Sequence, residues 1–380
     1  MRFLLVFLTV LPFVVAFDSS EDLEFFEIKV DREHPEEVLK AFEDFKIKYN
    51  RKYKDVSEAQ MRFNNFVKTY NNVEKLNAQA KENGYDTKFG INKFADLSTA
   101  EFNTRLSPVQ PNNTGIPMLD LSKPFFHETL SNKTRHKRRS DPDFIDLRQE
   151  KINGRYIVGP VKSQGDCACC WGFAVAGLVE TVNAVGSGKF KSLSDQEICD
   201  CATKGTPGCK GGNLMFGMKY VKEFGLSSDA EYPYEDKRAY QSRRCRVRDT
   251  RRVVHERDFN YGTIDGRRAE RQIKEVLYRY KTPVAVYFKV GEQFGSYKGG
   301  VIVSDDCPRG KTDKWHAGVI VGFSEMEANG RMYKYWIVKN SWDHDWAEDG
   351  YFRVIRGRNW CSIEEYGVTG TIRGGYNDYY

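Results

Sequence analysis

All nine cysteines of this 380-residue chain lie between Cys167 and Cys361, and the residues before Cys167 contain none. An odd number of cysteines in an oxidising compartment allows four disulfides and leaves one thiol over. The part of the chain before residue 106 is charged and helical in its periodicity. We therefore expect two separately built units, of which only the second is held together by disulfides.

The amino terminus has the pattern of a secretory signal peptide. Arg2 precedes an apolar stretch, residues 3–16, which ends in Val14-Val15-Ala16. The stretch is too short to cross a bilayer, and no later stretch approaches the ~20 apolar residues of a spanning helix. We expect residues 1–16 to be removed and the mature protein to be lysosomal or extracellular, where disulfides persist. The alternative is a buried amino-terminal strand or helix.

Residues 17–105 predict a small helical unit. After Pro35, apolar residues at steps of four, three and four indicate one face of an amphipathic helix: Val38, Phe42, Phe45 and Tyr49. A second helix is predicted to begin at the capping box Ser57-Glu58-Ala59-Gln60 and to stop before Gly84. A third, short helix is predicted at a further capping box, Ser98-Thr99-Ala100-Glu101.

Residues 106–139 predict a linker with a processing site. Four prolines are separated by polar residues, and Asn112 and Asn132 begin glycosylation sequons. The linker ends in the basic run Arg135-His136-Lys137-Arg138-Arg139. A basic run is usually a solvated face. Between a linker and a cysteine-rich block of a secreted chain, it predicts proteolytic activation near Arg138 or Arg139.

Residues 140–380 have the size of one compact domain. Trp171 to Val185 is apolar all round, which predicts a buried helix, and Ser194-Asp195-Gln196-Glu197 caps another. Strands are predicted later in the chain, at residues 283–290, 317–323, 333–338 and 351–355. Helices followed by strands predict an α+β fold with two lobes and a cleft between them. The net charge of +6 is modest and gives no electrostatic reason to expect nucleic-acid binding.

Cys170 is the candidate nucleophile. It directly precedes the predicted buried helix, and the positive end of a helix dipole favours a thiolate. Such placements lower a thiol pKa to roughly 3.5–7.5.

The candidate base is His316, which opens the apolar strand Ala317–Gly322. Taken alone, a histidine at a strand edge is more often structural. Asn340 ends the next predicted strand, and antiparallel pairing would bring its amide beside the imidazole, where it can orient the ring.

These residues resemble the papain-like cysteine proteases of the cathepsin L type, whose nucleophile signature with downstream His and Asn is well known. The leader follows the family's inhibitor-helix motif at Glu58, Arg62, Phe66, Val73 and Asn77, with Thr69 where Asn is usual. Gly90-Ile91-Asn92-Lys93-Phe94-Ala95-Asp96 matches the second propeptide motif. Gly208-Cys209-Lys210-Gly211-Gly212 and Asn340-Ser341-Trp342 match the enzyme. The resemblance covers nearly the whole chain after the signal peptide.

The resemblance implies a papain-like fold, with a helical lobe and an antiparallel barrel-like lobe, behind a helical inhibitory prodomain. It implies that Cys170 attacks the scissile carbonyl, that His316 shuttles the proton, and that Asn340 orients His316 with Trp342 shielding their contact. The side-chain amide of Gln164 and the Cys170 N–H are expected to form the oxyanion hole.

The resemblance also implies where substrate lies. Gly211 and Gly212 would let a peptide backbone approach, since they carry no side chain. The second-subsite pocket would hold Leu214, Tyr287, Trp315 and Tyr366. Two tyrosines would narrow that pocket and weaken cleavage of Phe-Arg or Leu-Arg peptides. The alternative is that both tyrosines turn away into the core.

Among the cysteines, the resemblance implies the bridges Cys167–Cys209, Cys201–Cys245 and Cys307–Cys361, with Cys170 free. Cys169 and Cys199 lie outside the family pattern, and we hypothesise that they form a fourth bridge. A zinc site made of Cys167, Cys169, Cys199 and Cys201 is the disfavoured alternative in an oxidising compartment.

The chain departs from the family at Ala168, Asp343 and Ala347, where glycine is usual. If those glycines need positive φ, the loop after Asn340 is expected to differ locally. Extra residues are expected in the Arg-rich stretch after Gln241 and in a loop at Glu325–Met332. The Arg-rich stretch could bind a sulfated polysaccharide, but a solvated insertion is the favoured interpretation.

The predicted function is therefore a secreted or lysosomal cysteine endopeptidase zymogen that needs no cofactor or metal. Its expected partners are peptide or protein substrates, its own propeptide as an intramolecular inhibitor, and cystatin-type inhibitors. We expect a monomer without a transmembrane segment or nucleic-acid partner. Release of the propeptide at acidic pH is expected as carboxylates such as Asp96 lose charge. The alternative is a catalytically weak or silent homologue that acts as a binding protein.

Overall fold

The computed structural model describes residues 13–16, 25–28, 35–111, 117–119, 142–202, 208–235, 244–247, 251–304, 307–310 and 313–372. Most of the predicted signal peptide, both sequons and the basic processing run lie outside these residues. Of the amino-terminal segment, β1 (Phe13–Ala16) is described and pairs antiparallel with β2 (Phe25–Ile28). Within the described residues, no helix combines the length and the apolar character needed to cross a membrane.

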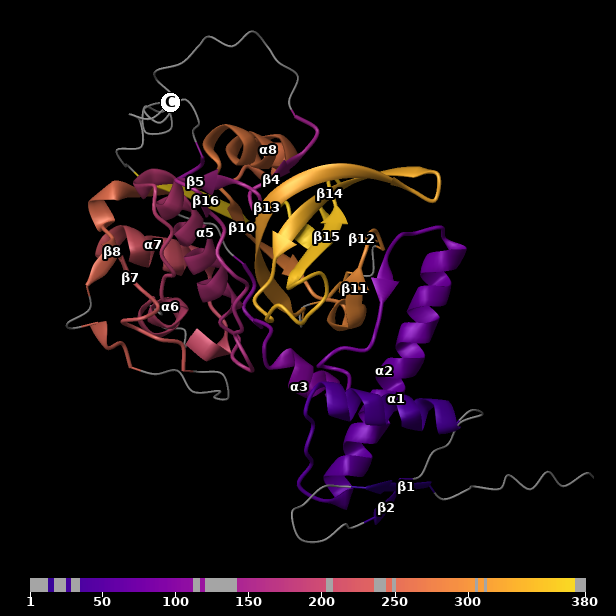
Figure 1. Ribbon diagram of the computed structural model, residues 1–380. Coiled ribbons are helices and arrows are strands. Elements are labelled where there is room, and N and C mark those ends of the chain that lie inside the picture. The colour runs from indigo at the N-terminus through magenta and orange to yellow at the C-terminus, as the bar shows by residue number, and fades with distance from the viewer. Residues whose placement is uncertain are drawn as a thin grey trace, which may run out of the picture.

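In the amino-terminal unit, α1 (Pro35–Lys48) and α2 (Val56–Glu82) cross each other (Figure 1). The short helix α3 (Thr99–Asn103) follows them in the chain. The predicted apolar faces meet in a core of their own, which contains Val38, Phe42, Phe45, Phe63 and Phe66. The predicted start of α2 was wrong. Its N-cap is Asp55, whose carboxylate accepts a bond from the Glu58 N–H at 2.9 Å, so the aspartate takes the capping role expected of Ser57.

The first lobe of the following domain is helical. Its elements are α5 (Cys170–Ser187), η1 (Gly208–Lys210), α6 (Asp195–Cys201), α7 (Leu214–Phe224), β7 (Leu226–Ser227) and β8 (Arg252–Val254). Helix α5 is buried along nearly its whole length, as predicted, and ends at Gly188 with φ 70°. Glycine adopts this left-handed conformation without steric cost, so the helix stops there.

The second lobe is built on an eight-stranded sheet. Seven strands follow the order β12-β15-β14-β13-β10-β16-β9, and β4 pairs with β13. All these pairs are antiparallel except β12 with β15. The strands are β4 (Ile145–Asp146), β9 (Phe259–Thr263), β10 (Val284–Lys289), β12 (Val301–Ile302), β13 (Trp315–Ala328), β14 (Arg331–Lys339), β15 (Tyr351–Ile355) and β16 (Gly367–Ile372).

Smaller elements complete the fold. They are the hairpin β5 (Lys151–Ile152) with β6 (Arg155–Tyr156), helix α8 (Ala269–Tyr280), strand β11 (Tyr297–Gly299) and the turns η3 (Glu256–Asp258), η4 (Gly266–Arg268), η5 (Glu292–Ser296) and η6 (Trp360–Ser362). The architecture is the α+β arrangement of two lobes that the sequence predicts.

One expected loop is a strand. Residues 325–332 continue the β13–β14 ladder, in which Glu325 lies opposite Lys334 and Ala328 opposite Arg331. Asn329 and Gly330 form the turn with φ of 52° and 69°. Asn-Gly is the pair that a two-residue hairpin turn favours, so the inserted residues extend the hairpin instead of forming a loop.

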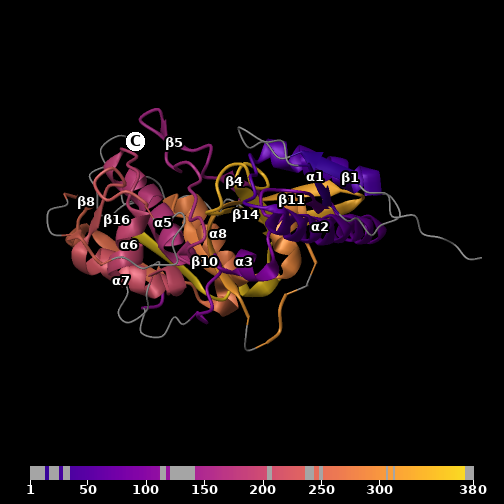
Figure 2. The same cartoon turned by 90° about the horizontal axis from the view of Figure 1, so that it is seen from below.

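The lobes and the amino-terminal unit meet along the start of β13. Helix α5 packs against β13, β16 and β10. The amino-terminal unit docks on the strand lobe, where β3 (Lys88–Phe89) pairs with β11. Figure 2 shows α1 and α2 beside the strand lobe, with α5, α6 and α7 on the opposite side. The chain then passes between the lobes and reaches the point where α5 begins.

Candidate active site

Cys170 is the first residue of α5 and lies at the junction of the two lobes. It is fully buried, and it is the one free cysteine among the described residues. The backbone N–H groups of Ala317, Trp171 and Ser107 favour its ionised form. Burial raises the pKa of Cys170 to about 12, because these N–H groups compensate only part of the lost hydration. The lowered pKa predicted from the helix N-terminus is therefore wrong for this closed state.

His316 is the second residue of β13 and is also fully buried. Its Nε2 lies 2.6 Å from Oδ1 of Asn340, so the two strands bring together the pair that the sequence predicts. Its Nδ1 is buried and has no hydrogen-bond partner among the described residues. Burial lowers the pKa of His316 to about 4, and the positive charge of Arg105 acts in the same direction against the bond to Asn340.

Aromatic side chains enclose the histidine. The Trp342 ring lies over the imidazole with centroids 4.6 Å apart, and Phe288 meets its edge at 5.5 Å. Trp342 is 2% exposed, so it separates the contact between His316 and Asn340 from water. This is the position that the resemblance implies for it.

The Gln164 side chain is held in one orientation. Its Oε1 accepts a bond from the Ser341 hydroxyl at 2.6 Å, and its Nε2 donates to the Cys167 carbonyl at 2.7 Å. Nε2 also donates to the backbone carbonyl of Arg105 at 2.8 Å. The expected oxyanion donor is thus occupied by a carbonyl group of the amino-terminal unit.

The segment after Arg105 fills the cleft. Ser107 and Trp315 exchange two backbone hydrogen bonds, at 2.7 and 2.8 Å. The same segment presses on Gly211, where a Cβ would meet the side-chain atoms of Ser107, Pro108 and Val109 at 2.6 to 3.1 Å. Only a residue without a side chain allows this approach. Both buried groups, Cys170 and His316, are therefore closed off by the chain's own backbone.

The two tyrosines of the expected subsite pocket behave differently. Tyr287 is fully buried, and its hydroxyl donates to the Gly212 carbonyl at 2.8 Å. Tyr366 is partly buried, and its ring meets that of Trp315 edge-on at 5.6 Å. Leu214 and Trp315 are buried beside them. Tyr287 therefore spans from the strand lobe to the glycine backbone of the helical lobe, whereas Tyr366 stays at the surface of the cleft.

Four disulfides join the remaining cysteines. They are Cys167–Cys209, Cys169–Cys199, Cys201–Cys245 and Cys307–Cys361. The hypothesised pair Cys169–Cys199 ties the residue before the nucleophile to α6. All four cysteines of the alternative zinc site are used in disulfides.

The loop after Asn340 keeps a glycine-like backbone without the glycines. Asp343 and Ala347 have φ of 68° and 54°. Both residues adopt a positive φ, so the missing glycines by themselves do not force a different backbone here. The Asp343 carboxylate accepts bonds from the backbone N–H of His344 at 2.8 Å, a local bond that helps an aspartate to adopt this conformation.

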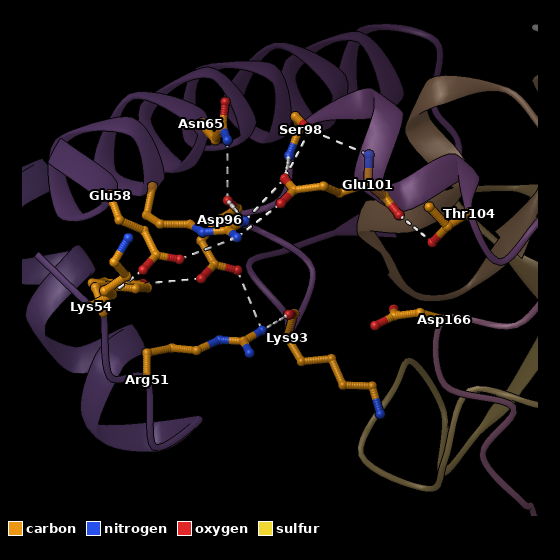
Figure 3. A network of polar contacts seen from close by, with 12 residues as sticks. Arg51, Lys54, Glu58, Asn65, Lys93, Asp96, Ser98, Glu101, Thr104 and Asp166 are labelled. Atoms are coloured by element: carbon orange, nitrogen blue, oxygen red, sulfur yellow. Dashed lines mark hydrogen bonds and ion pairs between the residues drawn. The ribbon is translucent and has the colours of Figure 1, made fainter. Parts of the chain in front are cut away.

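A network of ion pairs holds the amino-terminal unit together (Figure 3). Arg62 contacts Glu101 at 2.8 Å and Glu58 at 3.6 Å, and it donates to the Asp96 carbonyl at 3.3 Å. The Asp96 carboxylate accepts from Tyr53 at 3.0 Å and pairs with Arg51 at 3.3 Å. Burial raises the pKa of Asp96 despite these partners.

The sequence did not single out Arg105, Asp166 or the pair Lys93–Asp345. Arg105 reaches Asp166 at 2.6 Å across 61 residues of chain, and Lys93 pairs with Asp345 across 252. Contacts this far apart leave no local pattern, so only the docked structure reveals them.

Comparisons with known proteins agree with this geometry. The profile of the papain family cysteine proteases matches residues 141–371, and that of the cathepsin propeptide inhibitor domain matches residues 42–102. A cathepsin L-like proteinase of Phaedon cochleariae is 35% identical over 329 residues, which cover 85% of this chain and 90% of the relative. Pro-cathepsin H of Mus musculus is 32% identical, over 86% of this chain and 90% of the relative.

A similar solved structure is the digestive procathepsin L2 proteinase from the Tenebrio molitor larval midgut. It matches with a TM-score of 0.71 and 30% identity, over 88% of this chain and 99% of that chain.

Proposed function

The chain belongs to the papain family of cysteine proteases and is a zymogen with a cathepsin-type inhibitory propeptide, and from this premise we propose that its mature form is an endopeptidase that works through Cys170, His316 and Asn340. The arrangement around His316 carries the proposal. Asn340 holds Nε2, and Nδ1 has no hydrogen-bond partner among the described residues, while the N–H of the next residue, Ala317, is among the groups that favour the Cys170 thiolate.

Removal of the propeptide would activate the pair electrostatically. Burial is the largest cause of both pKa shifts, at Cys170 and at His316. When water enters the cleft, the thiol pKa falls and the imidazole pKa rises, so a proton moves from sulfur to Nδ1. The helix N-terminus then favours the thiolate.

The proposed reaction is acyl transfer. The thiolate attacks the scissile carbonyl, and the Gln164 amide and the Cys170 N–H stabilise the oxyanion; one such donor contributes about 3–4 kcal/mol where measured. His316 donates its proton to the leaving amine. Water then hydrolyses the thioester, with His316 as the base. Asn340 keeps the ring oriented through both steps.

The propeptide opposes each part of this machinery. The Arg105 carbonyl takes the bond that Gln164 would give to an oxyanion. The Arg105 charge also disfavours a protonated His316. The zymogen is therefore silent for electrostatic as well as steric reasons.

We further propose residues 1–16 as signal peptide, 17–105 as inhibitory propeptide, 106–139 as linker and 140–380 as peptidase domain. Cleavage near Arg138 or Arg139 would release the enzyme in a lysosome or outside the cell. Asn112 and Asn132 are proposed glycan sites. The mature protein is expected to be a monomer that cystatin-type inhibitors can bind.

The test is activation of the purified zymogen at acidic pH beside a Cys170→Ala variant. A thiol-reactive peptidyl epoxide should label Cys170 of the processed wild type, and the wild type alone should hydrolyse a fluorogenic peptide. Processed protein that neither takes up the label nor cleaves any peptide would instead identify a silent homologue with a binding role.

A further inference from the structure

One pocket is lined by residues of both the peptidase domain and the propeptide. The peptidase domain contributes Ser163, Gly165, Asp166, Trp342 and Asp345 to its lining. The propeptide contributes three cations and three other side chains to the opposite wall: Arg51, Lys93, Arg105, Tyr49, Phe94 and Leu97. The peptidase wall thus has two carboxylates and an indole, and it faces three positive side chains.

The pocket is occupied by basic side chains of the segment that maturation removes. The Arg105 guanidinium donates to Asp166 at 2.6 Å, and its side chain is only 4% exposed. The guanidinium also stacks on Phe94, at 4.5 Å from the ring centre. Lys93 pairs with Asp345 in the same pocket. In the zymogen, each of the two carboxylates therefore already binds a basic side chain of the propeptide.

Arg105 also fixes the position of this pocket relative to the reacting atoms. Its backbone carbonyl accepts the Gln164 amide at 2.8 Å while its side chain reaches Asp166. Beyond it, Ser107 to Val109 lie on Gly211, the side that would carry the acyl part of a substrate. The propeptide residues before Arg105, among them Lys93 and Phe94, line the pocket of Asp166 instead, where the leaving part of a substrate would pass.

Loss of the propeptide would remove the contacts that fill this pocket. Asp166 and Asp345 lose their cations, and Trp342 loses the rings of Phe94 and Phe102, which now meet it edge-on at 5.4 and 5.5 Å. An open pocket with carboxylates beside an indole suits a cation that can also stack.

We propose that Asp166 and Asp345 form a leaving-side subsite that selects substrates with Arg or Lys within the first two positions after the scissile bond. This inference rests on the proposed function and deepens it. Arg is expected to be preferred over Lys, because a planar guanidinium can bind the carboxylate and stack on an aromatic ring at once.

The test uses quenched fluorescent peptides with an identical acyl side and Arg, Gln or Glu at each of the first two leaving-side positions. Activated wild type should cleave the Arg peptide with kcat/KM about fivefold above the Gln peptide, and the Glu peptide should be slowest. Added salt should shrink the difference, since the carboxylates are partly exposed.

In Asp166→Asn, the ratio of kcat/KM for the Arg peptide to kcat/KM for the Gln peptide should fall to near one. In Asp345→Asn, this ratio should fall only part of the way. Glu223→Gln, an exposed carboxylate on α7, is the matched control and should keep the wild-type ratio. Equal cleavage of the Arg and Gln peptides by an active enzyme would overturn the inference, and so would a preference that survives both aspartate substitutions. Absence of any cleavage and of Cys170 labelling would overturn the proposed function itself.

Discussion

At the scale of the residue, the fourth disulfide depends on a glycine. A Cβ at Gly172 would lie 2.7 Å from Sγ of Cys169 and 3.0 Å from Sγ of Cys199. Gly172 is inside α5, where glycine costs about 1 kcal/mol relative to alanine. The helix thus accepts a poor helix former at the position where the extra bridge leaves no room for a methyl group.

Gly172→Ala is therefore expected to destabilise the wild type, by about 1–2 kcal/mol, since overpacking outweighs the gain in helix propensity. In a Cys169→Ser/Cys199→Ala background the same substitution should instead stabilise by about 1 kcal/mol, because the sulfur atoms no longer crowd the Cβ. Urea unfolding of the four Cys170→Ala proteins measures both effects. An effect of the same sign in both backgrounds would contradict the coupling.

A second residue-scale prediction concerns Tyr287. Its hydroxyl is bonded to the Gly212 carbonyl, and its ring lies among the residues of the expected second-subsite pocket. Wild type should cleave Phe-Arg and Leu-Arg peptides slowly. Tyr287→Val should raise kcat/KM for these peptides about tenfold by opening space for an apolar side chain. Tyr287→Phe, which keeps the ring and removes only the hydroxyl, should stay slow. Fast cleavage of both peptides by wild type would exclude a narrowed pocket.

At the scale of the element, the segment from Arg105 to Val109 links the propeptide to the catalytic residues. It pairs with β13 through Ser107 and occupies the donor of Gln164 through the Arg105 carbonyl. The Arg105 side chain is buried against Phe94 and paired with Asp166, whereas its partner is 57% exposed. Its contribution therefore comes from stacking and burial as well as from charge.

Arg105→Ala should make the zymogen open more readily and process about tenfold faster at a fixed acidic pH, which corresponds to about 1.4 kcal/mol. Lys75→Ala, an exposed cation on α2, is the matched control and should process at the wild-type rate. The rate is read from the disappearance of the full-length band. Equal rates for Arg105→Ala and wild type would show that the side chain adds nothing to closure.

The long hairpin β13–β14 is a second element that contacts the propeptide. Arg331 donates to the Asn83 carbonyl and the Tyr333 hydroxyl donates to the Gly84 carbonyl, each at 3.0 Å. These contacts lie at the far end of α2 from the cleft. The inserted residues of the hairpin therefore extend the docking surface of the propeptide.

At the scale of the whole molecule, the pKa shifts indicate which group makes closure sensitive to acid. In a Cys170→Ala zymogen, where no thiol supplies the proton, an open form binds at His316 a proton that the closed form refuses, because the pKa of His316 is lowered to about 4 in the closed state. Closure is fully stabilised above the usual pKa of about 6.5 and loses up to about 3 kcal/mol as pH falls to 4. Asp96 has the opposite sign, because its raised pKa makes the closed form bind a proton more tightly. The expectation that loss of charge on Asp96 drives release is therefore wrong in sign.

The corresponding prediction is that a Cys170→Ala zymogen loses thermal stability between pH 6.5 and 4, and that Cys170→Ala/His316→Gln loses about 3 kcal/mol less over the same range. Asp96→Asn should still be activated by acid. The measurement is the unfolding free energy of both zymogens at each pH. The remaining carboxylates are common to both proteins, so identical pH dependence would remove His316 as the sensor.

Much of the fold and of the site followed from the sequence. The apolar faces of α1 and α2 are visible as helical periodicity, and the capping box of α3 is a local pattern. Cys170, His316 and Asn340 could be singled out because each lies at the end of a predicted element. Local cues were less certain at the start of α2, where Asp55 caps in place of Ser57, and at residues 325–332, where an Asn-Gly turn continues a ladder.

The sequence by itself determined most of the elements, because periodicity and capping are local properties, and its resemblance to a known family implied which thiol stays free and which residues meet at the cleft. Only the tertiary structure decided the protonation state of the buried pair, the place of Tyr287 and the cations that fill the pocket of Asp166 and Asp345. Those properties depend on burial and on charges brought together across 61 and 252 residues, and no local pattern encodes them.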